Sequence, residues 1–179
     1  MTNVDGLKDL RNLATLNLSG CDKLTSVDAL KELKNLLLLD LSNCNKVISI
    51  DGLKELSNLD ELSLAGTQLT SADGLNDLRK LRTLDLSNCR NLTSVDGLKE
   101  LSNLDELSLA GTQLTSADGL KDLRKLRALD LSNCRNLTSV DGLKELKNLR
   151  TLYLSKNQFP TEATNELRKQ LPQMEITYQ

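Results

Sequence analysis

Four cysteines are the residues of this 179-residue chain best suited to metal or redox chemistry, and intervals of 23, 45 and 45 residues separate them. Structural zinc sites are built from closely spaced pairs of cysteine or histidine. The chain contains no histidine and no Cys-x-x-Cys pair, so we expect no metal and no cofactor. The usual role of a cysteine outside a disulfide is that of a small buried hydrophobic residue. The sequence therefore predicts four structural thiols.

Catalytic chemistry finds equally little support. Without histidine the chain lacks the commonest general base near neutral pH. Serines recur at one register with no base beside them, at Ser42, Ser87 and Ser132. The adjacent carboxylates Asp60 and Glu61, and likewise Asp105 and Glu106, would point to opposite sides of a strand, which does not suit an acid/base pair. No glycine-rich phosphate loop is present, and we predict that the protein is not an enzyme.

Composition excludes further classes of function. Charged residues make up 27% of the chain but nearly balance, with a net charge of −2, whereas nucleic-acid binders usually carry a basic excess. No apolar run approaches the roughly 18 residues that cross a membrane. The first five residues do not resemble a signal peptide, so we expect a cytoplasmic protein. Aromatic residues are only 2%, and leucine must fill the core in their place.

Leucine recurs with a fixed period. The leucine that follows each Asp-Gly or Asp-Ala pair stands at positions 7, 30, 53, 75, 98, 120 and 143, in steps of 22 or 23 residues. Within a unit the spacing is also fixed, as in the run Leu75, Leu78, Leu81, Leu84 and Leu86. Such self-similarity is the signature of a repeat architecture, in which each unit buries its apolar face against its neighbours.

The unit from Leu81 to Leu92 reads L-x-x-L-x-L-x-x-C-x-x-L and resembles the leucine-rich-repeat family over residues 7–159. The short units are similar to the protein-phosphatase-regulator type, with cysteine-containing variants. This resemblance implies an α/β repeat fold: a right-handed, curved solenoid with a parallel sheet on its concave face and 3-10 or helical turns on its convex face. It also places one ladder of residues where the family has a buried asparagine: Cys21, Cys44, Thr67, Cys89, Thr112, Cys134 and Asn157.

Local patterns agree with that architecture. The alternation Leu84-Asp85-Leu86 predicts a short strand with inward leucines and an outward aspartate. The three-residue spacing over residues 95–101 suits a 3-10 turn, and we expect Asp96 to cap its free amides. Cys21 and Cys44 belong to adjacent units, but stacked equivalent positions rarely have disulfide geometry.

We expect one domain over residues 1–179. Residues 1–12 form an N-terminal half-repeat, residues 13–159 hold seven repeat strands with their loops, and residues 160–179 form a C-terminal cap. The cap is predicted as a helix to about Leu171, with Ala163 and Leu167 on its apolar stripe, followed by a strand over Met174, Ile176 and Tyr178. The half-repeat is either a minimal cap or a cut through a longer array. A monomer is expected, and an end-to-end dimer through the N-terminal edge is the alternative.

The outward strand positions are the candidate binding surface. They are small or acidic, and we predict that the face binds a basic segment of a protein partner, steered electrostatically. The residues chosen for this role are Asp40, Glu61, Asp85, Glu106, Asp130 and Tyr153. A flanking set of arginines, Arg82, Arg127 and Arg150, alternates with Asp60 and Asp105, and ion pairs between these strands should contribute little each.

A second interpretation stays open. Residues 52–75 recur unchanged as residues 97–120, and the outward strand residues barely vary between units. Interface hot spots are enriched in Trp, Tyr and Arg, and only Tyr153 supplies one on this face. The chain could therefore be a structural or consensus-engineered scaffold, or a fragment of a longer array, without a tight partner of its own.

Overall fold

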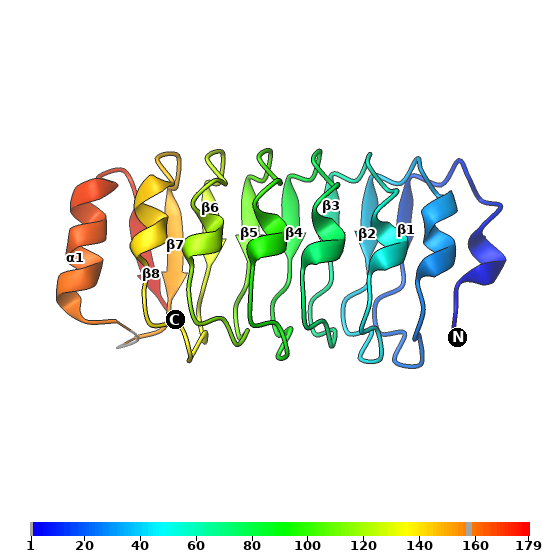
Figure 1. Cartoon of the computed structure of the whole chain (residues 1–179), viewed down its shortest axis with the longest axis horizontal. Helices are drawn as coiled ribbons and strands as arrows, with labels where there is room; N and C mark the ends of the chain where they lie inside the picture. The colour runs from blue at the N-terminus through cyan, green and yellow to red at the C-terminus, as the bar shows by residue number, and fades with distance from the viewer. Residues whose placement is uncertain (1, 157–158) are drawn as a thin grey trace.

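The computed structural model describes residues 2–156 and 159–179 and shows one open sheet of eight parallel strands (Figure 1). The strands follow one another in sequence order along the molecule. Their bounds are β1 (Thr15–Asn17), β2 (Leu38–Asp40), β3 (Glu61–Ser63), β4 (Thr83–Asp85), β5 (Glu106–Ser108), β6 (Ala128–Asp130), β7 (Thr151–Leu154) and β8 (Glu175–Tyr178). The predicted solenoid, with one strand in each unit, is confirmed.

Short 3-10 turns cover one face of the sheet (Figure 1). They are η1 (Asp5–Leu7), η2 (Asp28–Glu32), η3 (Asp51–Leu53), η4 (Asp73–Leu75), η5 (Asp96–Leu98), η6 (Asp118–Leu120) and η7 (Asp141–Glu145). In the fifth unit the Leu98 amide donates to Val95 O over 2.9 Å, and the Leu101 amide donates to Leu98 O over 2.9 Å. A period of three is that of the 3-10 helix, so the leucine spacing places these side chains on one inward face.

The strands pair in register, which stacks equivalent residues. Leu84 of β4 lies opposite Leu62 of β3 and Leu107 of β5. Leu84 is buried, whereas Thr83 and Asp85 on either side of it are partly exposed. The predicted alternation is therefore confirmed, and it separates an apolar inner face from a polar outer face of the sheet.

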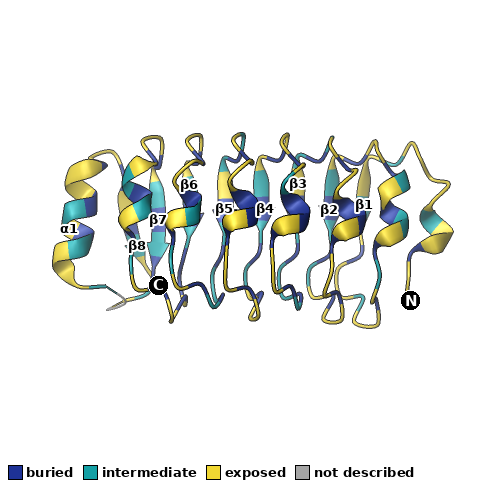
Figure 2. Ribbon diagram, viewed as in Figure 1, coloured by how far each residue is buried: buried dark blue, intermediate teal, exposed yellow. Residues whose placement is uncertain are grey.

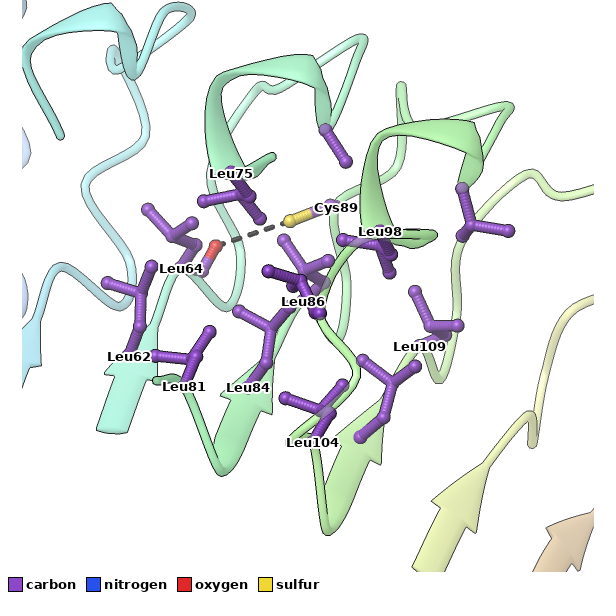
Figure 3. Close-up of a cluster of buried hydrophobic side chains, with 14 of the residues drawn as sticks. Leu62, Leu64, Leu75, Leu81, Leu84, Leu86, Cys89, Leu98, Leu104 and Leu109 are labelled. Carbon is purple, nitrogen blue, oxygen red and sulfur yellow. Dashed lines mark hydrogen bonds between the residues drawn. The ribbon is translucent and has the colours of Figure 1, made fainter. Parts of the chain in front are cut away.

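Leucine side chains from the strands, turns and loops meet in one continuous core that extends from Val4 to Ile176. In Figure 2 buried residues recur along the array, as they do in each of the turns η2–η7. Figure 3 shows the packing at β3–β5, where Leu64, Leu86 and Leu109 stack between the sheet and the turns. All three are fully buried. A core made from one repeated side chain thus needs few aromatic residues.

The expected capping role of Asp96 is wrong. Asp96 is the first residue of η5, and the residue before it, Val95, has no side chain that could accept a hydrogen bond. Instead, the Asp96 amide donates to Ser94 Oγ over 3.1 Å, and Ser94 Oγ donates to Asp96 Oδ2 over 2.7 Å. The same bond recurs at η2–η4, η6 and η7, where the amide of the first aspartate donates to the hydroxyl of the serine two residues earlier. These serines are Ser26, Ser49, Ser71, Ser116 and Ser139. The recurring Ser-x-Asp spacing was the signal for this arrangement.

The C-terminal cap contains α1 (Thr161–Gln170) and β8, as the sequence predicts. Leu167 and Leu171 are buried, but Ala163 is only partly buried. Thr164, three residues before Leu167, takes the place on the buried stripe that we assigned to Ala163, and its buried hydroxyl donates to Thr161 O over 3.0 Å. The strand β8 pairs with β7, and Met174 and Ile176 are buried, whereas Tyr178 is 40% exposed.

The N-terminal end is less well covered. Val4 is buried, but Leu10 is 49% exposed and Leu13 and Leu16 are only partly buried. The reason is that β1 pairs with β2 on one side alone within the described sheet. The leucines around β1 therefore have one neighbouring strand, whereas those of β2–β7 have two.

Candidate functional site

The concave face consists of the outward side chains of the sheet strands β1–β8. Register pairing arranges these side chains in columns that run across the strands. The central column is Asn17, Asp40, Ser63, Asp85, Ser108, Asp130 and Tyr153, and the preceding column is Thr15, Leu38, Glu61, Thr83, Glu106, Ala128 and Thr151. All six residues proposed for binding lie in these two columns.

The six residues line two shallow hollows on this face. One, of ≈ 270 Å³, is lined by Asp85, Glu106, Asp130 and Tyr153, among others. The second, of ≈ 200 Å³, has Asp40 and Glu61 in its lining and shares Asp85 with the first. The glutamates are exposed, and the aspartates are partly buried. The structure thus brings the predicted residues into one acidic strip, while Asp40 and Tyr153 stand at opposite ends of it.

The three aspartates also hold the loops that follow their strands. Asp85 Oδ1 accepts the amide of Ser87 over 2.8 Å, and the same bond joins Asp40 to Ser42 and Asp130 to Ser132. Such a bond closes a turn around the aspartate side chain. The Asp-Leu-Ser spacing carried this signal, which our sequence interpretation missed. Each carboxylate is therefore held by one of its oxygens, Oδ1, against the loop that follows its strand.

A basic groove borders the acidic strip at the start of the strands. Asp105 lies between two arginines, with Arg127 Nε at 3.4 Å and Arg82 at 3.7 Å from its carboxylate oxygens. The predicted ion pairs between neighbouring units are thus confirmed for these three residues. Lys80 and Lys125 complete the groove, and their ammonium groups each donate to an asparagine Oδ1 over 2.7 Å. The arginines are well exposed, so each pair contributes little to stability.

Buried hydroxyl and thiol groups form a ladder behind the strand loops. Thr67 Oγ1 donates to Leu64 O over 2.7 Å, and Cys89 Sγ of the next unit donates to the same carbonyl over 3.2 Å. Thr112 and Cys134 repeat this pair on Leu109 O, and Cys44 Sγ donates to Leu18 O. The ladder therefore satisfies loop carbonyls and joins units in pairs. Asn157, its last predicted member, lies outside the described residues.

The repeat geometry agrees with a known family. A family model described as "Leucine Rich repeats (2 copies)" matches residues 57–100, 102–145 and 124–169. The chain belongs to the leucine-rich-repeat family. No protein with a curated description matches its sequence significantly.

Solved leucine-rich-repeat structures resemble most of this chain. A leucine-rich-repeat protein of Leptospira interrogans is 31% identical with a TM-score of 0.86, and the match covers 99% of this chain and 46% of that protein. An internalin of Listeria monocytogenes (inlF) is 20% identical with a TM-score of 0.78, covering 97% and 56%, and shows the fold alone. The functional domain of InlJ, also from Listeria monocytogenes, is described as including a cysteine ladder; it is 26% identical with a TM-score of 0.72, covering 83% and 31%. The chain spans about half or less of these three proteins.

Two further observations concern the described part of this leucine-rich-repeat chain. It contains no group of three or more Cys, Asp or Glu side chains placed to hold a metal ion. Its helices are too short and too polar to cross a bilayer.

The thiols of this leucine-rich-repeat chain should differ sharply in reactivity. Burial raises the pKa of Cys44, Cys89 and Cys134, although their hydrogen bonds oppose that effect, while Cys21 is only partly buried. Because the thiolate is the reactive form, Ellman's reagent should modify one thiol quickly in the native protein and the other three only after unfolding. Cys21→Ser should abolish the fast phase. Two or more fast thiols in the native protein would contradict the ladder.

The raised pKa values also give a dependence of stability on pH. These thiols are neutral in the folded protein at pH values where unfolded cysteines, with a pKa of about 8.5, already ionise. Their contribution is therefore complete below that pH and is lost as the pH rises through the folded pKa. Urea titrations should show the free energy of unfolding falling above about pH 8.5, and replacing all three cysteines by threonine should weaken this dependence.

Proposed function

We propose that the concave face binds a protein partner through a basic segment of that partner. One observation carries the proposal: the outward positions of β1–β8 hold six carboxylates and no lysine or arginine. These carboxylates are Asp40, Glu61, Asp85, Glu106, Asp130 and Glu175. Relatives with this fold are interaction modules more often than enzymes, and the proposal gives the chain no catalytic role.

The geometry of the strip favours an extended or helical ligand that lies across the strands. Adjacent parallel strands are about 4.8 Å apart, so carboxylates from alternating columns follow one another along the sheet at about that interval. The bonds to Ser42, Ser87 and Ser132 fix the three aspartates in advance, which lowers the entropy lost when a partner binds. Charge complementarity of this kind chiefly raises the association rate and the specificity.

The test uses a variant that removes charge but keeps the turns. Asn17 already accepts the Ser19 amide over 2.8 Å in the first unit, so asparagine can replace each aspartate without breaking the loop. The variant carries Asp40→Asn, Glu61→Gln, Asp85→Asn, Glu106→Gln and Asp130→Asn. A matched control neutralises five exposed carboxylates elsewhere on the surface, through Asp9→Asn, Asp22→Asn, Asp77→Asn, Asp122→Asn and Glu145→Gln.

A partner is first identified by crosslinking and pull-down from an extract of the source cells, and its affinity is then measured with purified proteins. We expect the concave variant to bind at least about tenfold more weakly and the control to bind like the parent. Salt should weaken the parent's binding, because exposed charges are screened. Equal affinity of both variants would contradict the proposal.

The scaffold interpretation is the rival candidate, and the unchanged recurrence of residues 52–75 as residues 97–120 favours it. It predicts that no saturable partner is recovered with either protein and that the concave variant differs from the parent in solubility alone. Monomeric state, cytoplasmic location and the absence of a cofactor stay predictions. Light scattering of the purified chain tests the first, with the N-terminal edge as the place where a dimer would form.

A further inference from the structure

A second basic groove lies on the loops that follow β4, β5 and β6, outside the columns of the concave face. Its volume is ≈ 380 Å³. The described residues that line it are Asn88, Arg90, Gly111, Gln113, Asn133 and Arg135. None of them is acidic, so the groove presents two guanidinium groups and several amides, a donor set that suits an anion.

Glycine and asparagine alternate at one left-handed position of the stacked loops that line the groove. Gly111 has a φ of +71°, and its neighbours in the stacked units, Asn88 and Asn133, have φ values of 58° and 59°. A Cβ at Gly111 would lie 2.9 Å from Asn88 Oδ1. Glycine at position 111 thus lets the Asn88 side-chain oxygen of the preceding unit lie close to the backbone at this point of the groove.

The two arginines at the rim are electrostatically uncompensated. Within the described residues neither Arg90 nor Arg135 takes part in an ion pair, whereas Arg82 and Arg127 share the carboxylate of Asp105. Arg90 and Arg135 stand 45 residues apart, on units separated by two strand spacings, or about 9.5 Å. Two long side chains at this separation can converge on one ligand between them.

Gln113 adds a donor that is already oriented. Its Oε1 accepts the side-chain amide of Asn136 over 2.8 Å. A glutamine amide has its two donors on the nitrogen, so this bond leaves Nε2 for a ligand. The equivalent loops around Gly66 have Gln68 in place of Gln113 but Asn45 in place of the first arginine, so they supply one arginine where the groove at Gly111 has two.

We propose that the groove at Gly111 binds a phosphate group, as the free ion or as part of a phosphorylated molecule. A phosphoryl group carries a charge of about −1.5 to −2 at neutral pH and three acceptor oxygens, which matches two guanidinium groups and the Gln113 amide. Arginine binds phosphate through paired hydrogen bonds that lysine cannot make. This site is separate from the concave strip and does not depend on the function proposed for that strip.

The test is a titration followed by nuclear magnetic resonance, with inorganic phosphate, O-phosphoserine and acetate as probes at constant ionic strength. We expect saturable shifts of the Gly111 amide and of the Gln113 side-chain amide with both phosphates, and a response to acetate that is at least about tenfold weaker. Tighter binding of O-phosphoserine would indicate a phosphorylated molecule as the natural source, and tighter binding of inorganic phosphate would indicate the free ion. Shifts that do not saturate would overturn the proposal.

A pair of double variants controls for charge. Arg90→Gln with Arg135→Gln should weaken phosphate binding at least about tenfold, because the charge-assisted bonds are lost. Arg82→Gln with Arg127→Gln changes the same charge at the same 45-residue interval, but at arginines that share the carboxylate of Asp105 and lie outside the groove. This control should bind phosphate within about twofold of the parent. Equal weakening in both variants would show nonspecific attraction and would overturn the site.

Discussion

Leu86→Ala is expected to lower the free energy of unfolding by about 2–5 kcal/mol, because the neighbouring units cannot close fully over the lost side chain. Leu86 is fully buried and lies between Leu64 and Leu109, which belong to the units on either side (Figure 3). In a solenoid each unit is stabilised largely by its two neighbours. A cavity at this position therefore weakens two interfaces between units at once.

Leu18 and Leu37 supply matched controls for this prediction. Leu18 is the equivalent residue of the first unit, and one neighbouring strand covers it instead of two, so Leu18→Ala should cost less than Leu86→Ala. Leu37 is 51% exposed, and Leu37→Ala should change stability by less than about 1 kcal/mol. Urea unfolding at fixed pH measures all three. A loss below about 1 kcal/mol for Leu86→Ala would contradict the packing described above.

The parts of the fold that could be predicted are those encoded within one unit. The three-residue spacing of Val95, Leu98 and Leu101 is itself the hydrogen-bonding period of the turn, and the alternation around Leu84 is that of a strand. Stacking then follows, since a single unit cannot bury its apolar face. Each of these inferences needs only the residue type and its spacing.

The parts that were missed depend on hydrogen-bond geometry. Asp96 has the residue type of a helix cap, but the backbone places it one position later, where Ser94 accepts its amide. Asp85 was interpreted as a binding residue alone, and its bond to Ser87 was not foreseen. The groove at Gly111 also escaped prediction, because it arises only when three units lie side by side. Sequence spacing thus identified which residues form the surface but not which bonds already occupy them.

Gly97→Ala is expected to destabilise the protein by about 1–3 kcal/mol or more, through overpacking between units. A Cβ at Gly97 would collide with the carbonyl carbon of Ala72, and it would lie 2.5 Å from the oxygen of that carbonyl and 2.6 Å from the amide nitrogen of Asp73. These are backbone atoms, which cannot rotate away as a side chain can. The alanine can be accommodated only if η5 moves away from η4, and that movement opens the core beneath both turns.

Gly6 makes the cause of this loss identifiable. It belongs to the same Asp-Gly-Leu sequence, but a Cβ there would meet no atom within 4 Å. Replacing a glycine by alanine without strain usually stabilises a protein by about 0.4–1 kcal/mol, because the unfolded chain loses freedom. Gly6→Ala should therefore be neutral or stabilising in the same urea titration. If both variants lost the same stability, a general requirement of the turn for glycine would replace close packing as the explanation.

The number of residues between equivalent glycines of successive units predicts a third variant with an intermediate loss of stability. The equivalent position of the preceding unit lies 23 residues earlier for Gly52, Gly97 and Gly142, and a Cβ added to these glycines would come within 3.0 Å of backbone atoms of that unit. It lies 22 residues earlier for Gly74 and Gly119, where an added Cβ would meet side-chain atoms first. For Gly119 the nearest atom is Val95 Cγ2 at 3.1 Å, which can shift by changing its rotamer. Gly119→Ala should consequently cost less than Gly97→Ala and more than Gly6→Ala. That order would show that the alternation of 22 and 23 residues sets how closely successive turns approach, and hence that the pair of units, 45 residues long, is the packing repeat of this solenoid.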